Sequence, residues 1–119
     1  MQNENIKKFS TGAVRGTDAD DVRFDLIPPK PLFRLARTYK EGADKYGENN
    51  WKAGIPASNL INHALRHIYL WLSGDKSEDH LAHAVWNLIS TMYFEECRPE
   101  LIDCVEQGKD HEQASVSND

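Results

Sequence analysis

The chain has 119 residues, a formal net charge of −5 and 28% charged residues, which is ordinary for one globular domain. The acidic balance argues against a general nucleic-acid-binding protein, because such proteins present a basic surface. No apolar run reaches the roughly 20 residues needed to span a bilayer, so we expect neither a membrane segment nor a secretory signal. The two cysteines are seven positions apart, too far for an easy disulfide on a helix, which favours a reduced, cytoplasmic setting.

The first 21 residues are polar and contain Gly12, Gly16 and a run of aspartates. This composition predicts a flexible N-terminal segment over 1–21. Apolar and polar residues then alternate from Val22 to Ile27, before two prolines that stop any helix. The alternation predicts an extended arm that is too isolated to form a sheet by itself.

Apolar residues at helical spacing predict two helices in the first half of the ordered region. The first helix should begin at Pro31 and end before Gly47, because proline suits a first turn and glycine suits a C-terminus. Residues 48–56 hold Gly and Pro and predict a loop. Ser58 is a good N-cap for the second helix, which should end at Gly74.

A third helix is predicted after Ser77, and it should run to about Cys97. A short fourth helix is predicted over 101–107, and the polar tail 108–119 is expected to be disordered. The second and third helices must be antiparallel because their connection is short. The predicted fold is therefore all-α: a small bundle of three main helices plus a short C-terminal helix, spanning 22–107 with the extended N-terminal arm. We expect a dimer, because a three-helix core is thin. The expected core positions are Leu32, Leu35, Ala36, Tyr39, Ala43, Leu60, Ile61, Leu65, Ile68, Leu72, Leu81, Ala84, Val85, Leu88, Ile89 and Met92.

Four of the five histidines fall between positions 63 and 83 of this helical hairpin. Residues near the shared turn face each other, so His67 should meet Asp79 and His83, with Asp75 in the turn. Imidazole and carboxylate together bind divalent ions, here Mg²⁺ or Mn²⁺. The structural alternative is that each histidine only hydrogen-bonds a neighbour and that Asp79 only begins a helix.

Glu41 and Asp44 form an E-x-x-D pair on the first helix, a spacing that lets two acids grip one metal ion. The alternative is a solvated helix face beside Lys40 and Lys45.

Cationic, amide and aromatic side chains complete the set of candidate ligand-binding residues. Lysine and arginine neutralise phosphates, and asparagine and tryptophan read or stack on a base. Trp51 could instead be a core residue beneath its loop. The arm residue Arg23 could clamp onto the bundle or complete the pocket of a neighbouring subunit. The candidate substrate-binding residues are Lys45, Asn50, Trp51, Arg66, Asn87 and Arg23.

Four strings occur together in this chain: RFDLIPP from Arg23, EGADKYGENNW from Glu41, NHALRH from Asn62 and DHLAHAVWN from Asp79. As a set, over about positions 22 to 96, they resemble a family of small phage and prophage proteins described as a dATP/dGTP diphosphohydrolase N-terminal domain. The resemblance implies a helical domain in purine deoxynucleotide metabolism, placed in the host cytoplasm if phage-encoded. It also implies a mechanism similar to that of MazG-type pyrophosphohydrolases, in which acidic residues on helices bind magnesium and water attacks the α-phosphate.

Two functions from different classes follow. The first is metal-dependent hydrolysis of purine deoxynucleoside triphosphates to the monophosphate and pyrophosphate. The alternative is a non-catalytic module that sequesters a nucleotide or signalling molecule, favoured because histidines stand where a second acidic pair is expected. A purely structural or protein-interaction role is the third reading. The predicted catalytic residues are Asp79, His83 and His67, and the predicted metal ligands are Asp79, His83, Asp75, Glu41 and Asp44.

Overall fold

The computed structural model describes residues 5–17 and 21–106. The chain divides into two compact units, Met1–Lys30 and Pro31–Asp119, and each is treated separately below. The predicted tail 108–119 lies outside the described residues. Within the described part of the chain, no helix is long and apolar enough to cross a membrane.

The first unit contains a small antiparallel β-hairpin that the sequence did not predict. Strands β1 (Ile6–Lys8) and β2 (Val14–Gly16) pair in the register that places Ile6 opposite Gly16. Gly12 makes the turn possible, because its φ of +96° is one that residues with a side chain rarely adopt. With only three residues per strand, the hairpin gives almost no alternation from which a strand could be recognised.

The extended arm predicted for residues 22–27 is wrong, because a 3₁₀ turn, η1 (Phe24–Leu26), lies there. The backbone N–H of Leu26 donates to the carbonyl of Arg23 at 3.1 Å. The Arg23 guanidinium also donates to the Asp25 carboxylate at 2.8 and 2.9 Å. These local bonds close the chain into a turn that an alternation of apolar and polar residues does not reveal.

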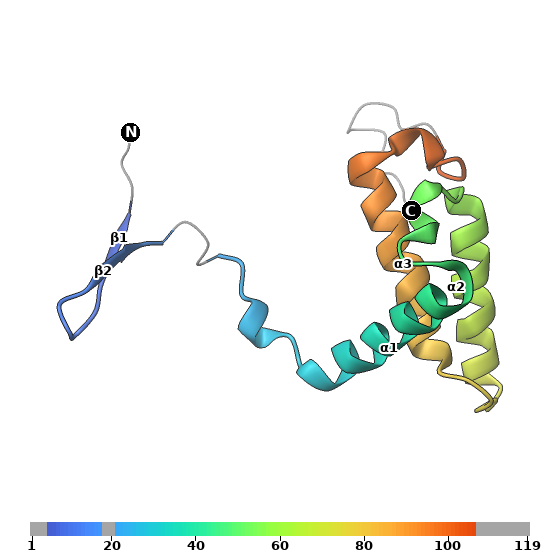
Figure 1. The fold of residues 1–119 in the computed structure, drawn as a ribbon, viewed down its shortest axis with the longest axis horizontal. Helices are drawn as coiled ribbons and strands as arrows, with labels where there is room; N and C mark the ends of the chain where they lie inside the picture. Colours follow the sequence, from blue (N-terminus) through green and yellow to red (C-terminus); the bar gives the residue numbers. More distant parts are fainter. Residues whose placement is uncertain (1–4, 18–20, 107–119) are drawn as a thin grey trace. The chain divides into compact units, whose positions relative to one another are not determined.

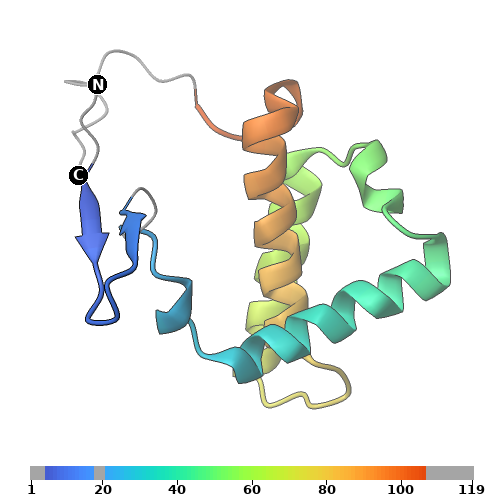
Figure 2. The ribbon, with the colours of Figure 1, turned by 60° about the vertical axis from the view of Figure 1, so that its left-hand side comes forward.

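The second unit contains the three predicted helices, α1 (Pro29–Tyr46), α2 (Ala57–Leu72) and α3 (His80–Cys97). The prediction of an antiparallel α2–α3 hairpin is confirmed, and α1 crosses this hairpin near the turn that joins α2 to α3 (Figures 1 and 2). A short 3₁₀ turn, η2 (Asn50–Ala53), lies in the loop between α1 and α2.

The start of α2 differs from the prediction, because Pro56 and not Ser58 is its N-cap residue. The Pro56 side chain cannot accept a hydrogen bond, so the acceptor at the start of α2 is the carboxylate of Asp103. The Ser58 N–H and hydroxyl each donate to the Asp103 carboxylate at 2.8 Å. The predicted fourth helix over 101–107 is wrong: a single 3₁₀ turn, η3 (Pro99–Leu101), precedes Asp103 instead.

The start of α3 also differs, because Asp79 and not Ser77 is the N-cap residue. The Asp79 carboxylate accepts the N–H of Ala82 at 3.3 Å. Ser77 instead donates its hydroxyl to Asp75 at 2.6 Å, within the turn before the helix. Both residues are good caps, and the competing Asx-type turn at Asp75 leaves the cap position to Asp79.

Small and polar side chains fill the space between α2 and α3, with Leu60 and Phe94 the largest fully buried side chains. Several apolar residues predicted for the core are exposed instead: the Leu72 residue is 64% exposed and the Met92 residue is 61% exposed. The other predicted core residues that are exposed are Leu32, Ala36, Leu65, Val85 and Leu88. The α2–α3 hairpin therefore carries apolar side chains outside its own core.

Candidate functional site

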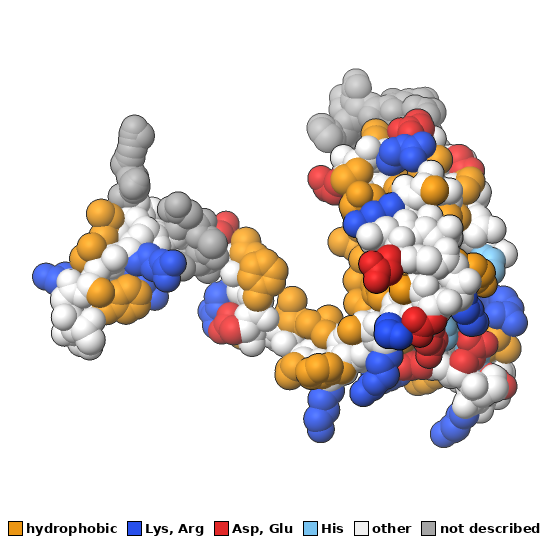
Figure 3. Space-filling model, in the orientation of Figure 1, with side chains coloured by type: hydrophobic (Ala, Val, Ile, Leu, Met, Phe, Trp, Pro, Cys, Tyr) orange, Lys and Arg blue, Asp and Glu red, His pale blue; other side chains and the backbone are white. Residues whose placement is uncertain are grey.

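A cavity of about 620 Å³ lies between α1, the loop that contains η2, and one face of the α2–α3 hairpin. Charged side chains of both signs gather on the surface where α1 crosses, as Figure 3 shows. Most of the residues predicted for the site line this one cavity although they come from three separate segments. They are Glu41, Lys45, Asn50, Trp51, Arg66, His67, His83 and Asn87.

Trp51 is both a packing residue and a wall of the cavity. Its ring centroid lies 5.1 Å from that of Tyr93 and 5.8 Å from that of Phe94, in edge-to-face contacts. Tyr39 and Trp86 each lie 6.1 Å from it. The indole thus holds the η2 loop against α3, and it faces the cavity with its remaining surface.

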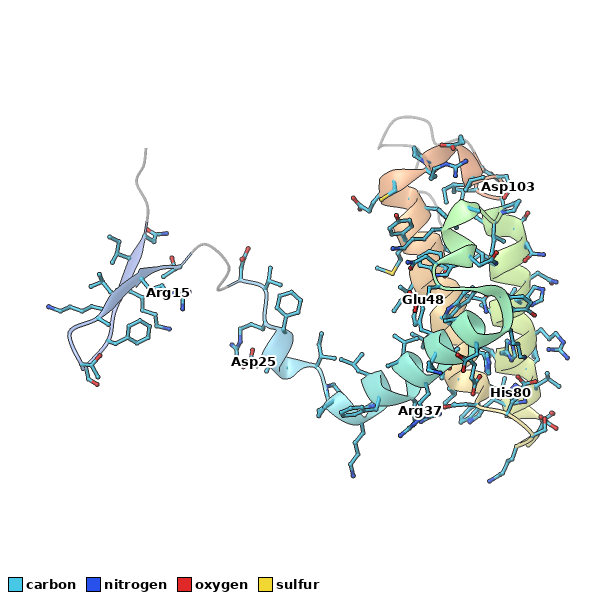
Figure 4. All side chains as sticks on the ribbon, in the orientation of Figure 1. Arg15, Asp25, Arg37, Glu48, His80 and Asp103 are labelled. Atoms are coloured by element: carbon cyan, nitrogen blue, oxygen red, sulfur yellow. The ribbon has the colours of Figure 1, made fainter. Side chains whose placement is uncertain are left out.

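A chain of hydrogen bonds runs from the turn before α3 to α2. The Asp75 carboxylate lies 2.5 Å from Nε2 of His80, and Nδ1 of His80 lies 2.9 Å from Nδ1 of His67. Hydrogen bonds from Ser77 and then His80 lower the pKa of Asp75 to about 2, so its carboxylate is ionised at neutral pH. Asp75 is therefore an acceptor, which requires a proton on Nε2 of His80. His80, the middle member of this chain, is labelled in Figure 4 at the start of α3.

His67 and His83 form a stacked pair at the cavity, with ring centroids 4.9 Å apart and planes at 16°. Burial and, after it, the charge of His83 lower the pKa of His67, which favours its neutral imidazole. Nδ1 of His83 lies 2.8 Å from the carbonyl oxygen of Asp79 and donates to it. This bond places a proton on Nδ1 of His83, and Nε2 lies 3.6 Å from the Glu41 carboxylate.

Two of the predicted acids are engaged elsewhere. The Asp79 carboxylate accepts two hydrogen bonds from Arg34, one of them at 2.9 Å, and this guanidinium lowers its pKa. Asp44 pairs with Lys40 at 2.8 Å on the exposed side of α1. Asp75 and Asp79 line a separate hollow of about 430 Å³ next to the turn. The five predicted metal ligands therefore do not converge on one point.

The group that does converge is His67, Glu78 and His80, each of which offers one ligand atom within 4.8 Å of the others. Glu78 was not among the residues predicted for the site. Its position directly before the Asp79–His80 string was the signal that could have identified it. Further cavity-lining residues that the sequence did not single out as ligand-binding are Tyr39, Asn59 and His63.

Arg23 belongs to the first unit, where its guanidinium pairs with Asp25 at 2.8 Å. Both side chains are exposed there. A role for Arg23 at a nucleotide pocket remains a prediction.

Comparison with known proteins identifies one family. The profile of the family described as dATP/dGTP diphosphohydrolase, N-terminal, matches residues 11–104. No curated protein and no solved structure matches the chain. The match includes the four strings noted in the sequence and extends beyond them on both sides. The chain therefore belongs to the dATP/dGTP diphosphohydrolase N-terminal family.

Proposed function

We propose that this protein hydrolyses purine deoxynucleoside triphosphates, releasing the monophosphate and pyrophosphate, with the help of a divalent metal ion. The observation that carries the proposal is the cavity, which is lined by cations, aromatic rings and imidazoles from α1, α2, α3 and the η2 loop. Family membership supports a purine nucleotide as the ligand. A volume of about 620 Å³ is within the usual range of small-molecule sites.

The cavity offers a separate group for each part of a nucleotide. Lys45 and Arg66 would bind phosphate oxygens, because ammonium and guanidinium groups form charge-assisted hydrogen bonds to them. The amide side chains of Asn50 and Asn87 would read the base or sugar. The exposed part of the Trp51 ring would stack on the purine.

His83 is the proposed proton acceptor, and His67 is the imidazole stacked on it. Because Nδ1 of His83 donates to the Asp79 carbonyl, Nε2 is the nitrogen that would take a proton from water. The pKa of His67 is lowered, which favours the neutral form of this imidazole beside His83. Asp79 would act as a positioning residue, because it begins α3 and orients His83, while Arg34 holds its carboxylate.

The residues near the turn fit a divalent cation, because one ligand atom each of His67, Glu78 and His80 lies within 4.8 Å of the others. Such an ion, when bound, neutralises phosphate charge and makes a coordinated water more acidic. Of the carboxylates on α1, Glu41 lines the cavity and Asp44 does not.

A nucleotide-binding module without catalysis is the second candidate. The observation that favours it is that Asp44 and Asp79 are both tied to a basic side chain, with Lys40 and Arg34 respectively. These two carboxylates are then not free to bind a metal ion, whereas MazG-type pyrophosphohydrolases hold magnesium with several acids on their helices.

Purified protein incubated with each deoxynucleoside triphosphate and Mg²⁺ or Mn²⁺ separates the two functions. If the protein is a hydrolase, it should release pyrophosphate from dATP or dGTP, and His83→Gln should abolish this release. Tyr69→Phe is the control, because Tyr69 is an exposed residue of α2 that does not line the cavity. Tight binding with unchanged nucleotide would establish the module. Neither turnover nor binding with any nucleotide would refute both functions.

We also propose that the protein acts as a homodimer in the cytoplasm, through the face of the α2–α3 hairpin opposite the cavity. Helical periodicity puts the apolar side chains of both helices on this face. Helices of 16 and 18 residues give a footprint of roughly 500 Å² per copy, about 1,000 Å² in total, which suffices for a specific interface. No side chain of the set is charged, so a second copy meets no like charge. The face consists of Ile61, Leu65, Ile68, Leu72, Leu81, Val85, Leu88 and Met92.

A further inference from the structure

We propose that His67, Glu78 and His80 form the metal site of this protein, and that Asp75 positions His80 for it. The proposal rests on the proposed function for its biological role, but the binding of an ion can be tested without turnover. The ligand class is a divalent first-row transition ion, such as Mn²⁺ or Co²⁺. The three residues come from α2, from the turn after it and from the start of α3, and one ligand atom of each lies within 4.8 Å of the others.

Asp75 gives His80 the form that a metal ligand needs. Its carboxylate is held by the Ser77 N–H at 3.2 Å and the Ser77 hydroxyl at 2.6 Å, and it lies 2.5 Å from Nε2 of His80. The proton of His80 is therefore on Nε2, and Nδ1 carries the lone pair. A ligand histidine whose second nitrogen donates to a carboxylate is the usual arrangement around protein-bound metal ions.

The two imidazoles are placed as neighbouring ligands of one ion. Their Nδ1 atoms lie 2.9 Å apart. Two nitrogens at about 2.1 Å from a metal ion and at right angles to each other are about 3.0 Å apart. In this structure Nδ1 of His67 donates to Nδ1 of His80. As ligands, the two residues would each offer Nδ1 and carry their proton on Nε2, so neither imidazole would lose a proton overall.

The donor set selects the class of ion. Two imidazole nitrogens and one carboxylate suit borderline divalent ions, whereas Mg²⁺ prefers oxygen ligands only. The His80 side chain is only 1% exposed, and the Glu78 side chain is 43% exposed, so the site is closed on its protein side and open at the carboxylate. Room for water or phosphate oxygens therefore lies on the side of Glu78.

The site also accounts for a contact that is otherwise unusual. A buried pair of imidazoles, one of which is bound to an ionised carboxylate, is a costly group to hold inside a small helical hairpin. A structural core would be served equally well by apolar residues at positions 67 and 80. The turn from Asp75 to Asp79 instead brings every polar group of this cluster to one place.

The test uses the full chain, freed of metal with a chelator, and Mn²⁺ titration followed by electron paramagnetic resonance of the free ion. The wild type should bind one Mn²⁺ per chain. Glu78→Gln should weaken binding at least tenfold, and Asp75→Asn should weaken it by about 10- to 100-fold, the range for loss of an outer carboxylate. Glu41→Gln tests the α1 carboxylate that lines the cavity and should weaken binding less than Glu78→Gln does. Glu95→Gln, at an exposed position of α3, is the control and should bind as the wild type does. Far-UV circular dichroism checks that each variant is folded.

A second readout avoids substitution in the core. Substoichiometric Mn²⁺ should broaden the ¹⁵N-imidazole signals of His67 and His80 before that of His63. The proposal is overturned if Mn²⁺ stays free, if Glu41→Gln is the more damaging change, or if His63 broadens first. Hydrolysis of dGTP by a protein in which this site binds no ion would refute the site and leave the proposed function intact. Binding of an ion here by a protein that hydrolyses no nucleotide would support the site and refute the proposed hydrolysis.

Discussion

Lys45 and Arg66 bring positive charge to the cavity from different helices, α1 and α2. A hydrogen bond to a charged group contributes about 1.5–3 kcal/mol, and 1.4 kcal/mol corresponds to tenfold in affinity. We therefore expect Lys45→Ala and Arg66→Ala each to weaken dGTP binding about tenfold or more, as measured by titration calorimetry. Lys40→Ala is the control, because Lys40 pairs with Asp44 on the exposed side of α1. Equal losses in all three variants would show that the effect is not local to the cavity.

Asp79 combines two roles that substitutions can separate. Asp79→Ala removes the N-cap of α3 and should lower the free energy of unfolding by about 1 kcal/mol, whereas Asp79→Asn keeps a good cap. Because its carboxylate is held by Arg34 and its carbonyl orients His83, Asp79→Asn should keep most of the wild-type hydrolysis. Urea unfolding and a pyrophosphate assay check both results. Loss of activity in Asp79→Asn to the level of His83→Gln would mean that the carboxylate itself takes part in the reaction.

The sequence predicted which residues line the cavity better than it predicted which side chains form ion pairs with each other. The types and spacing of Lys45, Trp51 and Arg66 were enough to place them at one cavity. The partners of Asp44 and Asp79 were not predictable, because an acid on a helix can face a metal ion or an arginine 45 residues away with the same local sequence. Glu78 was missed for the same reason.

The ends of the helices are determined by competition between several capping residues. Ser58 and Ser77 both have the chemistry of N-caps, and both donate instead to an aspartate. The α2 cap comes from Asp103, which is far along the chain, so local sequence could not reveal it. The existence and pairing of α2 and α3 were predictable because their apolar periodicity is long and their connection is short.

The Asp103 cap should make the stability of the helical unit depend on pH. Hydrogen bonds from the Ser58 N–H and hydroxyl hold the pKa of Asp103 below its ordinary value. A carboxyl with a depressed pKa in the folded state stabilises the fold above its unfolded pKa, near 4, and this contribution is lost as pH falls through the folded value. Asp103→Asn should therefore melt below the wild type at pH 7, and the difference should shrink below about pH 4. Melting curves from pH 2.5 to 7 test this, with Glu106→Gln as the control; a difference that grows in acid would contradict it.

The whole molecule presents two different faces of one helical hairpin. One face carries the cavity with its histidines and cations, and the other carries the apolar residues from Ile61 to Met92 that the sequence assigned to a core. The prediction that all of these residues are buried in a core is wrong for this chain, because periodicity finds an apolar helix face but does not show what covers it. In the proposed dimer, the second copy would cover this exposed apolar face.

Substitution on the apolar face should dissociate that dimer. Light scattering behind size-exclusion chromatography should give twice the chain mass of 13.6 kDa for the wild type and a single chain mass for Met92→Glu. The reason is that the new charge would be buried without a partner in the interface. Leu32→Glu, on exposed α1, should stay dimeric. A monomeric wild type at micromolar concentration would instead favour coverage of this face by another segment or another protein.

The product of dGTP hydrolysis in H₂¹⁸O tests the central claim most directly. If the cavity directs water to the α-phosphate, mass spectrometry should find dGMP with one ¹⁸O atom and unlabelled pyrophosphate in equal amounts. His83→Gln should reduce this product to background, because its Nε2 is the proposed proton acceptor. Intact dGTP with both Mg²⁺ and Mn²⁺, or dGDP with labelled phosphate, would contradict the proposed reaction.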